Sequence, residues 1–274
     1  MTSDRYAVIG HPVRHSLSPR IHAHFAELTG EDIVYELLEA PEEGFSERAG
    51  AFFDAGGRGL NVTLPFKAEA RAWAGRATGR AHAAAVANTL TRLDDGSIEA
   101  DNTDGAGLVR DLLANVGLRL SGARILLVGA GGAARGVLGP LLAERPASLF
   151  VANRTPERAH SLADAFSGEG PVHGGGFEQL GRQPYDLVIN ASASSLGGEL
   201  PPLAAGVVAR GGTVYDMMYG EAAEPFLRWG REAGAESVHD GLGMLVEQAA
   251  ESFRIWRGVM PPTGPVLSAL RGSG

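Results

Sequence analysis

The chain contains no cysteine, only one lysine and no long apolar run. Without cysteine it can form no disulfide, no thiolate metal site and no cysteine nucleophile, so we expect a cytoplasmic protein without a metal. No stretch approaches the roughly 18 consecutive apolar residues of a membrane span, and the N-terminal residues lack the basic and apolar regions of a signal peptide. A net charge of −8 opposes non-specific binding to nucleic acid. We therefore expect neither a membrane nor a nucleic-acid partner.

Lys67 is the single lysine among 24 basic residues, all the others being arginine. It could be a chance survivor of a composition that favours arginine. Arginine stays protonated in proteins, however, whereas a lysine can lose its proton when its surroundings lower its pKa. Lys67 is therefore a candidate for proton transfer before any motif is considered.

Segments typical of strands and helices alternate along the 274 residues, which favours an α/β fold with mostly parallel sheets. The strand candidates are short apolar runs at 6–9, 33–38, 60–64, 125–128, 149–151, 187–189 and 213–215. A hairpin is expected from 88–93 and 97–102 around Asp95-Gly96. Helices are expected at 18–28, 45–55 and 242–257, the first with Ser18 as N-cap and Pro19 behind it.

A glycine-rich turn follows the strand candidate 125–128 and begins a helix. Its residues are Gly129, Ala130, Gly131, Gly132, Ala133 and Ala134, which fit the pattern G-x-G-x-x-A. The glycines permit a tight turn and a close backbone approach to a pyrophosphate, and the helix N-terminus supplies amide donors. Because the pattern stands between a strand and a helix, we interpret it as a dinucleotide site and not merely as a turn.

The end of the next strand candidate indicates which dinucleotide binds. An NAD site usually has an acidic residue there for the ribose 2′-hydroxyl, but this chain has Asn153, Arg154 and Thr155. Arg154 can bind a 2′-phosphate through charge-assisted hydrogen bonds, and Arg158 could add a second cation. The alternative is a solvated arginine pair at a helix start, where basic residues oppose the helix dipole. These residues favour NADP.

The N-terminal part of the chain holds several polar segments near strand ends. They are Ser16-Leu17-Ser18-Pro19, Asn61-Val62-Thr63 before Pro65 and Lys67, Asn88-Thr89, and 101–105 with Asp104. Each has a structural explanation alone, as a helix cap or a turn. Together they offer many neutral donors and acceptors with one lysine and one aspartate, which suits a neutral polyol bearing one carboxylate.

These segments closely resemble the shikimate dehydrogenase family. The family's serine pair, N-V-T-x-P-x-K, N-T, D-N-T-D-G, G-A-G-G-A, N-R-T and G-x-x-M-L-x-x-Q-A motifs all occur here in order, the last at 241–249. The resemblance extends from about residue 6 to residue 257. It implies the reversible, NADP-dependent reduction of 3-dehydroshikimate to shikimate, in the biosynthesis of chorismate and the aromatic amino acids.

The resemblance also implies roles for individual residues. Lys67 and Asp104 would form the catalytic pair. Ser16 and Ser18 would hold the substrate carboxylate. The groups on the substrate ring would be Asn61, Thr63, Asn88, Asp104, Gln248 and Tyr219. The remaining cofactor contacts would be Ser192, Met217 and Gly241. The residues depart from the family at Gly79, often acidic in relatives, at Ser192, often threonine, and at Tyr219-Gly220-Glu221, usually Tyr-Asn-Pro.

The predicted architecture has two domains with a cleft between them. Residues 1–103 would form a mostly parallel α/β substrate domain, completed by the C-terminal helices 240–274, and residues 104–239 a Rossmann-type NADP domain. Whether the protein is a monomer or a homodimer stays open. So does the proton chemistry, because burial lowers the pKa of a lysine while a neighbouring carboxylate raises it; Asp104 could orient Lys67 or share its role.

Two other functions remain open. One is a quinate/shikimate dehydrogenase with broader substrate or cofactor use, and the other is a non-catalytic dinucleotide sensor on the same fold. A short-chain dehydrogenase is excluded, because that class needs Tyr-x-x-x-Lys and the residue four before Lys67 is Thr63.

Overall fold

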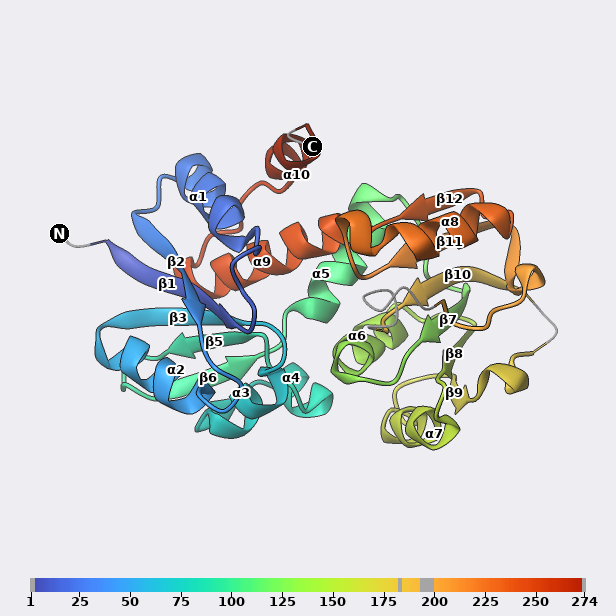
Figure 1. Ribbon diagram of the computed structural model, residues 1–274, viewed down its shortest axis with the longest axis horizontal. Helices are drawn as coiled ribbons and strands as arrows, with labels where there is room; N and C mark the ends of the chain where they lie inside the picture. The colour runs from blue at the N-terminus through green and yellow to red at the C-terminus, as the bar shows by residue number, and fades with distance from the viewer. Residues whose placement is uncertain (1–2, 182–183, 193–199, 273–274) are drawn as a thin grey trace. The chain divides into compact units, whose positions relative to one another are not determined.

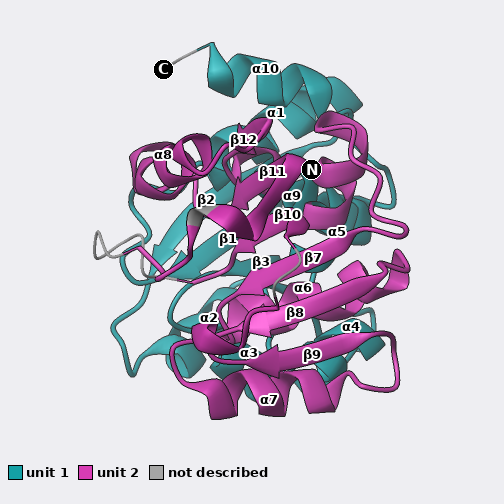
Figure 2. Cartoon of the chain, turned by 90° about the vertical axis from the view of Figure 1, so that its right-hand side faces the viewer, with its two compact units in different colours: residues 1–107, 245–274 teal, residues 108–244 magenta. Residues whose placement is uncertain are grey.

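The computed structural model describes residues 3–181, 184–192 and 200–272. Its chain divides into two compact units, residues 1–107 with 245–274 and residues 108–244 (Figure 2). We call these unit 1 and unit 2. The first unit is built from two separate stretches of chain, and the second from one. No helix within the described ranges is long and apolar enough to cross a membrane.

Unit 1 contains a six-stranded mixed sheet in the order β2-β1-β3-β5-β6-β4 (Figure 1). Its strands are β1 (Asp4–Gly10), β2 (Ile33–Glu39), β3 (Gly57–Val62), β4 (Arg76–Ala77), β5 (Thr89–Arg92) and β6 (Ile98–Asp101). Strand β1 pairs in parallel with β2 and β3, whereas β5 is antiparallel to β3 and β6. The hairpin predicted around Asp95-Gly96 is confirmed as β5–β6, and Gly96 has the positive φ of 83° that favours glycine.

Seven helices accompany this sheet in the described part of unit 1. They are α1 (Ser18–Thr29), α2 (Phe45–Asp54), α3 (Lys67–Trp73), α4 (Gly79–Ala84), α5 (Asp104–Arg110), α9 (Leu242–Arg257) and α10 (Gly264–Arg271), of which α5 and α9 continue across the unit boundary. Apolar side chains of β1, β3 and α2, among them Ile9, Leu60 and Phe45, are fully buried in one core cluster. The helices at 18–28, 45–55 and 242–257 are confirmed.

The predicted cap of α1 is wrong. Leu17, not Ser18, occupies the N-cap position, and no side chain caps the helix. The hydroxyl of Ser16 instead accepts the backbone N–H of Ser18 at 3.2 Å. Because of this shift by one residue, the Ser18 side chain is not engaged as a helix cap.

Unit 2 has a six-stranded, wholly parallel sheet in the order β12-β11-β10-β7-β8-β9. The strands are β7 (Arg124–Val128), β8 (Ser148–Ala152), β9 (Val172–Gly175), β10 (Tyr185–Asn190), β11 (Val208–Asp216) and β12 (Ser237–His239). The helices are α6 (Gly132–Ala143), α7 (Pro156–Ala165) and α8 (Glu224–Glu232), with a π-helical turn at Asp111–Asn115 and 3₁₀ turns at Phe177–Gln179, Ala205–Val207 and Gly220–Ala222. Numbered within the unit, this is the strand order 3-2-1-4-5-6 of a dinucleotide-binding fold.

Both faces of the unit 2 sheet are covered, as the apolar strands require. Leu127, Val137 and Ile189 are fully buried in a core cluster shared with residues of α6 and α7. Val188, Val214 and Phe226 are fully buried in a second cluster shared with α8. The α/β class and the predominance of parallel pairing predicted from the sequence are confirmed.

Candidate active site

The lysine singled out by the composition forms an ion pair with Asp104. Lys67 begins α3 just beyond the end of β3, and Asp104 begins α5, so two helix starts bring the side chains together. Lys67 Nζ lies 2.5 Å from Asp104 Oδ2, with 21% of the lysine side chain and 6% of the aspartate side chain exposed. An amine held beside a carboxylate at a partly open position can exchange a proton with a bound molecule.

Asp104 is itself held in place by two asparagines. Its second oxygen, Oδ1, accepts from Asn88 Nδ2 at 2.9 Å, and its backbone N–H donates to Asn102 Oδ1 at 3.0 Å. Asp104 is 5% exposed, and its carboxylate therefore meets Lys67 through one oxygen in a fixed orientation. Sequence reasoning assigned Asn102 to a turn, and the structure shows that this turn positions the aspartate.

Asn88 is a junction between the hairpin and helix α9. Besides Asp104, its Nδ2 contacts Thr103 Oγ1 at 2.9 Å and Gln248 Oε1 at 3.0 Å. Its Oδ1 accepts the backbone N–H of Thr103 at 2.8 Å. Asn88 is 2% exposed and Gln248 9% exposed. The structure thus brings together four residues that the sequence proposed separately, namely Lys67, Asn88, Asp104 and Gln248.

Asn61 belongs to the same polar cluster. Its Nδ2 donates to the backbone oxygen of Asn88 at 3.2 Å, to Ser252 Oγ at 2.9 Å and to Thr89 Oγ1 at 3.3 Å. Its Oδ1 accepts from the hydroxyl of Tyr35 at 2.7 Å. Asn61 is 6% exposed, so these contacts hold its amide in a defined orientation.

The two serines also contact each other. Ser16 Oγ lies 3.1 Å from Ser18 Oγ, at the start of α1. Ser18 is 6% exposed, whereas Ser16 is half-buried. Thr63 is half-buried in the turn between β3 and α3, where its backbone N–H donates to Ile9 O at 3.0 Å.

Sequence reasoning missed two members of this cluster, Tyr35 and Ser252. Ser252 is fully buried on α9 and contacts Thr89 Oγ1 at 2.8 Å besides Asn61. Its place one helical turn after Gln248 was a usable signal, since residues i and i+4 share a helix face. Tyr35 lies inside a strand and belongs to no motif, so no local pattern could have found it.

The glycine turn of unit 2 has the open backbone that a pyrophosphate needs. Gly129 has φ of 109°, and a Cβ there would lie 3.1 Å from the backbone of Ala191 and Ser192. Gly131 is the N-cap of the twelve-residue helix α6, and a Cβ at Gly131 would meet no atom within 4 Å. The free N-terminus of α6 is therefore accessible to an anion.

The register of the sheet brings the second predicted cofactor segment to the same edge. Val128 pairs with Ala152 and with Asn190, so the residues after β7, β8 and β10 follow adjacent strand ends. Arg154, Thr155 and Arg158 are exposed, while Asn153 Nδ2 donates to Thr155 O at 3.0 Å. With cations and amides but no acidic side chain at 153–155, these residues fit the 2′-phosphate of NADP.

The remaining predicted cofactor contacts, Ser192, Met217 and Gly241, follow the carboxyl ends of β10, β11 and β12. Ser192 donates through its backbone N–H and its Oγ to Asn190 Oδ1, at 3.1 and 2.7 Å. A Cβ at Gly241 would lie 2.2 Å from Met217 O, so only glycine permits this close approach. Tyr219 is half-buried in unit 2, where burial raises the pKa of its phenol.

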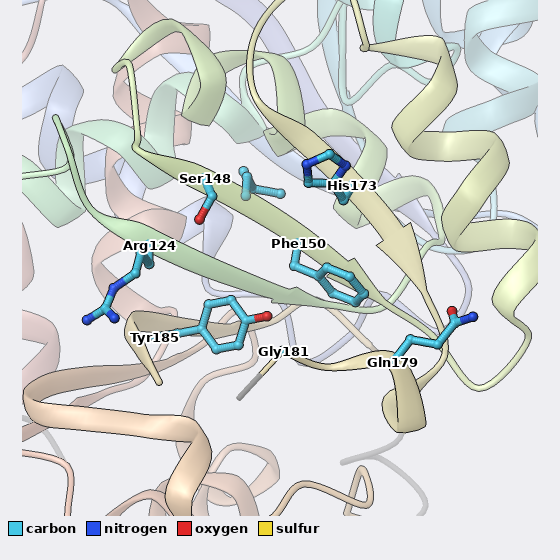
Figure 3. A pocket seen from close by; sticks show the side chains of 8 residues that line it. Arg124, Ser148, Phe150, His173, Gln179, Gly181 and Tyr185 are labelled. Atoms are coloured by element: carbon cyan, nitrogen blue, oxygen red, sulfur yellow. The ribbon is translucent and has the colours of Figure 1, made fainter. Parts of the chain in front are cut away.

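A hollow of about 270 Å³ lies elsewhere on unit 2 (Figure 3). Arg124, Ser148 and Tyr185, which line it, are the first residues of β7, β8 and β10. In sheets of this type dinucleotides bind at the carboxyl ends of the strands. This hollow is at the opposite edge and is not the nucleotide site.

Comparison with known proteins agrees with the geometry. The family model for the shikimate dehydrogenase substrate binding domain matches residues 8–90, that for shikimate / quinate 5-dehydrogenase matches residues 111–196, and that for the shikimate 5′-dehydrogenase C-terminal domain matches residues 241–271. A protein of Methylococcus capsulatus named shikimate dehydrogenase (NADP(+)) is 55% identical over 97% of this chain and 96% of its own length. The chain belongs to the shikimate dehydrogenase family.

Solved structures have the same fold. An Ael1 enzyme from Pseudomonas putida matches with a TM-score of 0.91 and 43% identity, covering 98% of each chain. Shikimate 5-dehydrogenase of Thermus thermophilus, solved with NADP(H) and shikimate, matches with a TM-score of 0.84 and 32% identity, covering 99% of this chain and all of that one. The resemblance inferred from the separated motifs is thus confirmed at the level of the family.

Proposed function

We propose that this protein catalyses the NADP-dependent, reversible conversion of shikimate to 3-dehydroshikimate. The observation that carries the proposal is the Lys67–Asp104 pair, set among neutral amides and hydroxyls. The proposal is supported by relatives of 52–55% identity that are named shikimate dehydrogenase (NADP(+)). We further infer that it works in the cytoplasm, as a monomer or a homodimer.

The substrate would bind through both hydrogen-bond donors and hydrogen-bond acceptors of the protein. Ser16 and Ser18 would donate to the carboxylate, which then needs no basic side chain. The groups proposed for the ring hydroxyls are Asn61, Thr63, Asn88, Asp104, Gln248 and Tyr219. Because neutral donors and acceptors outnumber charges in the cluster, it suits a polyhydroxylated ring better than a polyanion.

NADP, when bound, would supply the hydride acceptor or donor. The residues proposed to hold it are Gly129, Ala130, Gly131, Gly132, Ala133, Asn153, Arg154, Thr155, Arg158, Ser192, Met217 and Gly241. The α6 N-terminus would face the pyrophosphate, and Arg154 the 2′-phosphate.

Proton transfer would be the task of Lys67. As the substrate alcohol is oxidised, its carbon loses a hydride and its hydroxyl loses a proton, which Lys67 Nζ would accept. In the reverse direction the protonated Lys67 would return this proton to the oxygen of the ketone. Asp104 would hold the amine in place through Oδ2.

The direct test is to mix the purified protein with shikimate and NADP⁺ and to follow the absorbance of the reduced nicotinamide. We expect turnover with this pair, and kcat/KM at least about 100-fold lower when NAD⁺ replaces NADP⁺ or quinate replaces shikimate. Comparable rates with quinate or NAD⁺ would assign the broader quinate/shikimate activity. No turnover with any pair would contradict an enzymatic function and leave the dinucleotide sensor.

A further inference from the structure

A buried carboxyl group joins the ends of strands β10 and β11 in unit 2. Asp216, the last residue of β11, is the register partner of Asn190, the last residue of β10, and both are fully buried. Asp216 Oδ2 accepts from Asn190 Nδ2 at 3.0 Å, and Asp216 Oδ1 accepts the backbone N–H of Met218 at 2.9 Å. Asn190 Oδ1 in turn accepts the backbone N–H and the hydroxyl of Ser192, at 3.1 and 2.7 Å. One continuous hydrogen-bonded chain therefore runs from Met218 to Ser192.

The direction of the hydrogen bonds in this chain follows from its two backbone ends. A backbone N–H can only donate, so Ser192 requires the oxygen of the Asn190 amide to face it. Nδ2 of Asn190 then faces position 216 as a donor, and the N–H of Met218 faces the same side chain as a second donor. The side chain at 216 must therefore accept at both of its polar atoms. A carboxyl group does so, whereas an asparagine would place its NH₂ group against one of the two donors.

The chain of hydrogen bonds lies at the edge of the sheet where the cofactor is proposed to bind. The glycine turn and α6 follow β7, Arg154 follows β8 on one side of β7, and β10 and β11 lie on its other side (Figure 1). Adjacent strands are about 4.8 Å apart. With the pyrophosphate at the α6 N-terminus and the 2′-phosphate at Arg154, the adenosine half of NADP would extend over β8 and the nicotinamide half over β10 and β11. Asp216 therefore ends one of the strands that the reacting half of the cofactor would reach.

The same carboxyl group fixes the peptide between Met217 and Met218, whose N–H it accepts. The oxygen of that peptide lies so close to Gly241 that a Cβ there would be 2.2 Å away. On either side of this peptide, the N–H of Met217 donates to Asn190 O at 3.0 Å, and Met218 O accepts the N–H of Gly241 at 2.8 Å. Asp216 thus fixes the backbone at two proposed cofactor contacts, after β11 and β12, and through Asn190 at a third, after β10.

We propose that Asp216 is a positioning residue that holds the nicotinamide half of NADP for hydride transfer, acting through Asn190 and Met218 without touching the cofactor. This inference rests on the cofactor contacts given under the proposed function. Hydride transfer requires the reacting atoms to be about 3–3.5 Å apart, and a misplacement of about 1 Å can lower the rate about 100-fold. The adenosine half is held by other groups, at the α6 N-terminus and at Arg154, so its binding does not depend on Asp216.

The first test is Asp216→Asn, which keeps the shape of the side chain and replaces one acceptor by a donor. The second is the double variant Asn190→Asp with Asp216→Asn. It satisfies both backbone donors again, because the amide now donates to the carboxylate from the opposite side. The control is Asp186→Asn, because Asp186 lies on the same strand β10 but at the opposite edge of the sheet, where it pairs with Arg124 at 2.7 Å.

The rate of nicotinamide reduction in a single turnover would be measured with shikimate and NADP⁺, together with melting temperatures and dissociation constants for adenosine 2′,5′-bisphosphate. We expect Asp216→Asn to lower the single-turnover rate about 10- to 100-fold. Its dissociation constant for adenosine 2′,5′-bisphosphate should stay within about 2-fold of the wild-type value, because the α6 N-terminus and Arg154 are intact. The double variant should recover the rate to within about 5-fold of the wild type. Asp186→Asn should leave the rate and the dissociation constant unchanged.

Two results with Asp216→Asn would overturn the inference. One is an unchanged single-turnover rate, and the other is a loss of adenosine 2′,5′-bisphosphate binding as large as the loss of rate. If Asp216→Asn does not fold, the double variant decides, because it restores the pattern of donors and acceptors. A double variant that stays slow or does not fold would also overturn the inference. A wild-type protein that does not oxidise shikimate would instead overturn the proposed function, and this inference with it.

Discussion

The amine of Lys67 has one fixed partner, because Asp104 reaches it through Oδ2 while Oδ1 is held by Asn88. A group that exchanges a proton with the substrate must return to the same position in every turnover. The asparagine contacts of Asp104 provide this, since they fix the carboxylate that orients the amine. We therefore assign the proton transfer to Lys67, and the orientation of the Lys67 amine to Asp104.

Lys67→Ala should lower kcat by about 10³-fold, in the range typical for loss of a general acid or base. The dissociation constant for shikimate should change less than about 10-fold, because the serines and amides of the site remain. Stopped-flow or steady-state rates and titration calorimetry would measure the two effects separately. Lys67→Arg is the matched variant: it keeps the charge beside Asp104 but cannot give up its proton, so it should be equally slow. A fast Lys67→Arg enzyme would remove proton transfer from this residue.

Arg154 determines the choice of cofactor in our proposal. Arg154→Ala should raise KM for NADP⁺ about 10- to 100-fold, because a charge-assisted hydrogen bond contributes about 1.5–3 kcal/mol. KM for NAD⁺, which lacks the 2′-phosphate, should stay within about 2-fold of its wild-type value. Initial rates with both cofactors at saturating shikimate would test this. Arg158→Ala, at a position one helical turn away, tests in the same way whether the second cation contributes to NADP⁺ binding. If Arg154→Ala raised KM equally for NAD⁺ and NADP⁺, the assignment of Arg154 to the 2′-phosphate would be contradicted.

How far the site could be predicted depends on whether a residue lies in a continuous motif. Lys67, Asn88, Asp104 and Gln248 are in short polar segments at strand ends, and the structure brings them together. Tyr35 is recognised only in the structure, because its partner Asn61 lies on another strand. Sequence patterns report neighbours along the chain, whereas buried hydrogen bonds depend on packing between distant segments.

At the scale of elements, an ion cluster ties α4, β6 and α9 together behind Asp104. Arg80 of α4 binds Asp101 of β6 at 2.5 and 2.8 Å, and Glu251 of α9 at 3.1 Å. Glu251 also pairs with Arg254 at 2.8 Å. Asp101 accepts the N–H of Asn102, whose side chain holds Asp104. The cluster therefore fixes the segment that carries Asp104.

Arg80→Met should lower the free energy of unfolding by about 3 kcal/mol, because Asp101 would lose its cation in a buried position. The hydrogen bond from Arg254, together with the charge of Arg80, holds the pKa of Glu251 at about 2, below its ordinary 4.5. A lowered carboxyl pKa stabilises the fold above pH 4.5, and this contribution is lost as the pH falls from 4.5 towards 2. Arg80→Met removes only the part of this contribution that comes from Arg80, because Arg254 remains. The melting temperatures of variant and wild type, measured from pH 7 to pH 2.5, should therefore draw closer as the pH falls below 4.5.

Arg231→Met is the control for this prediction. Arg231 pairs with Glu224 at 2.8 Å, but both side chains are about half exposed, at 53% and 45%. Exposed ion pairs contribute less than about 1 kcal/mol, so this variant should melt close to the wild type at every pH. A difference between Arg80→Met and wild type that stays constant down to pH 2.5 would show that Glu251 is not stabilised by Arg80.

Strands and helices with a clear hydrophobic pattern were predicted well, whereas elements too short to show such a pattern were not. The four apolar strand candidates of unit 2 and the helix 242–257 have the expected places, because burial on both faces or on one stripe leaves a clear pattern. The helices α3 and α4, with seven and six residues, are too short to show a period. Strand β9, Val172–Gly175, contains two glycines and a histidine, and only its place in the sheet makes it a strand.

At the scale of the whole molecule, unit 1 depends on helix α9, which begins at Leu242, far along the chain from residue 107, where the first segment of unit 1 ends. Helix α9 contributes the fully buried Phe253, and Trp256, which stacks on Tyr6 with centroids 4.7 Å apart. The indole of Trp256 donates to Leu90 O at 3.2 Å, and Gly59 leaves space for it, since a Cβ there would lie 2.4 Å from its Nε1. The N-terminal segment alone thus lacks part of its own core.

We therefore expect the two segments of the chain to behave differently when produced separately. The fragment 108–244 carries a complete parallel sheet with its own core, and should unfold cooperatively and bind adenosine 2′,5′-bisphosphate through Arg154. The fragment 1–107 should show no cooperative unfolding transition by circular dichroism. Without α9, the apolar side chains of β1 and β3 that this helix covers would be exposed to water. Co-expression with 245–274 is the control, and should restore a transition since it returns Phe253 and Trp256. A cooperative transition of 1–107 alone would show that the first segment stabilises its sheet without α9.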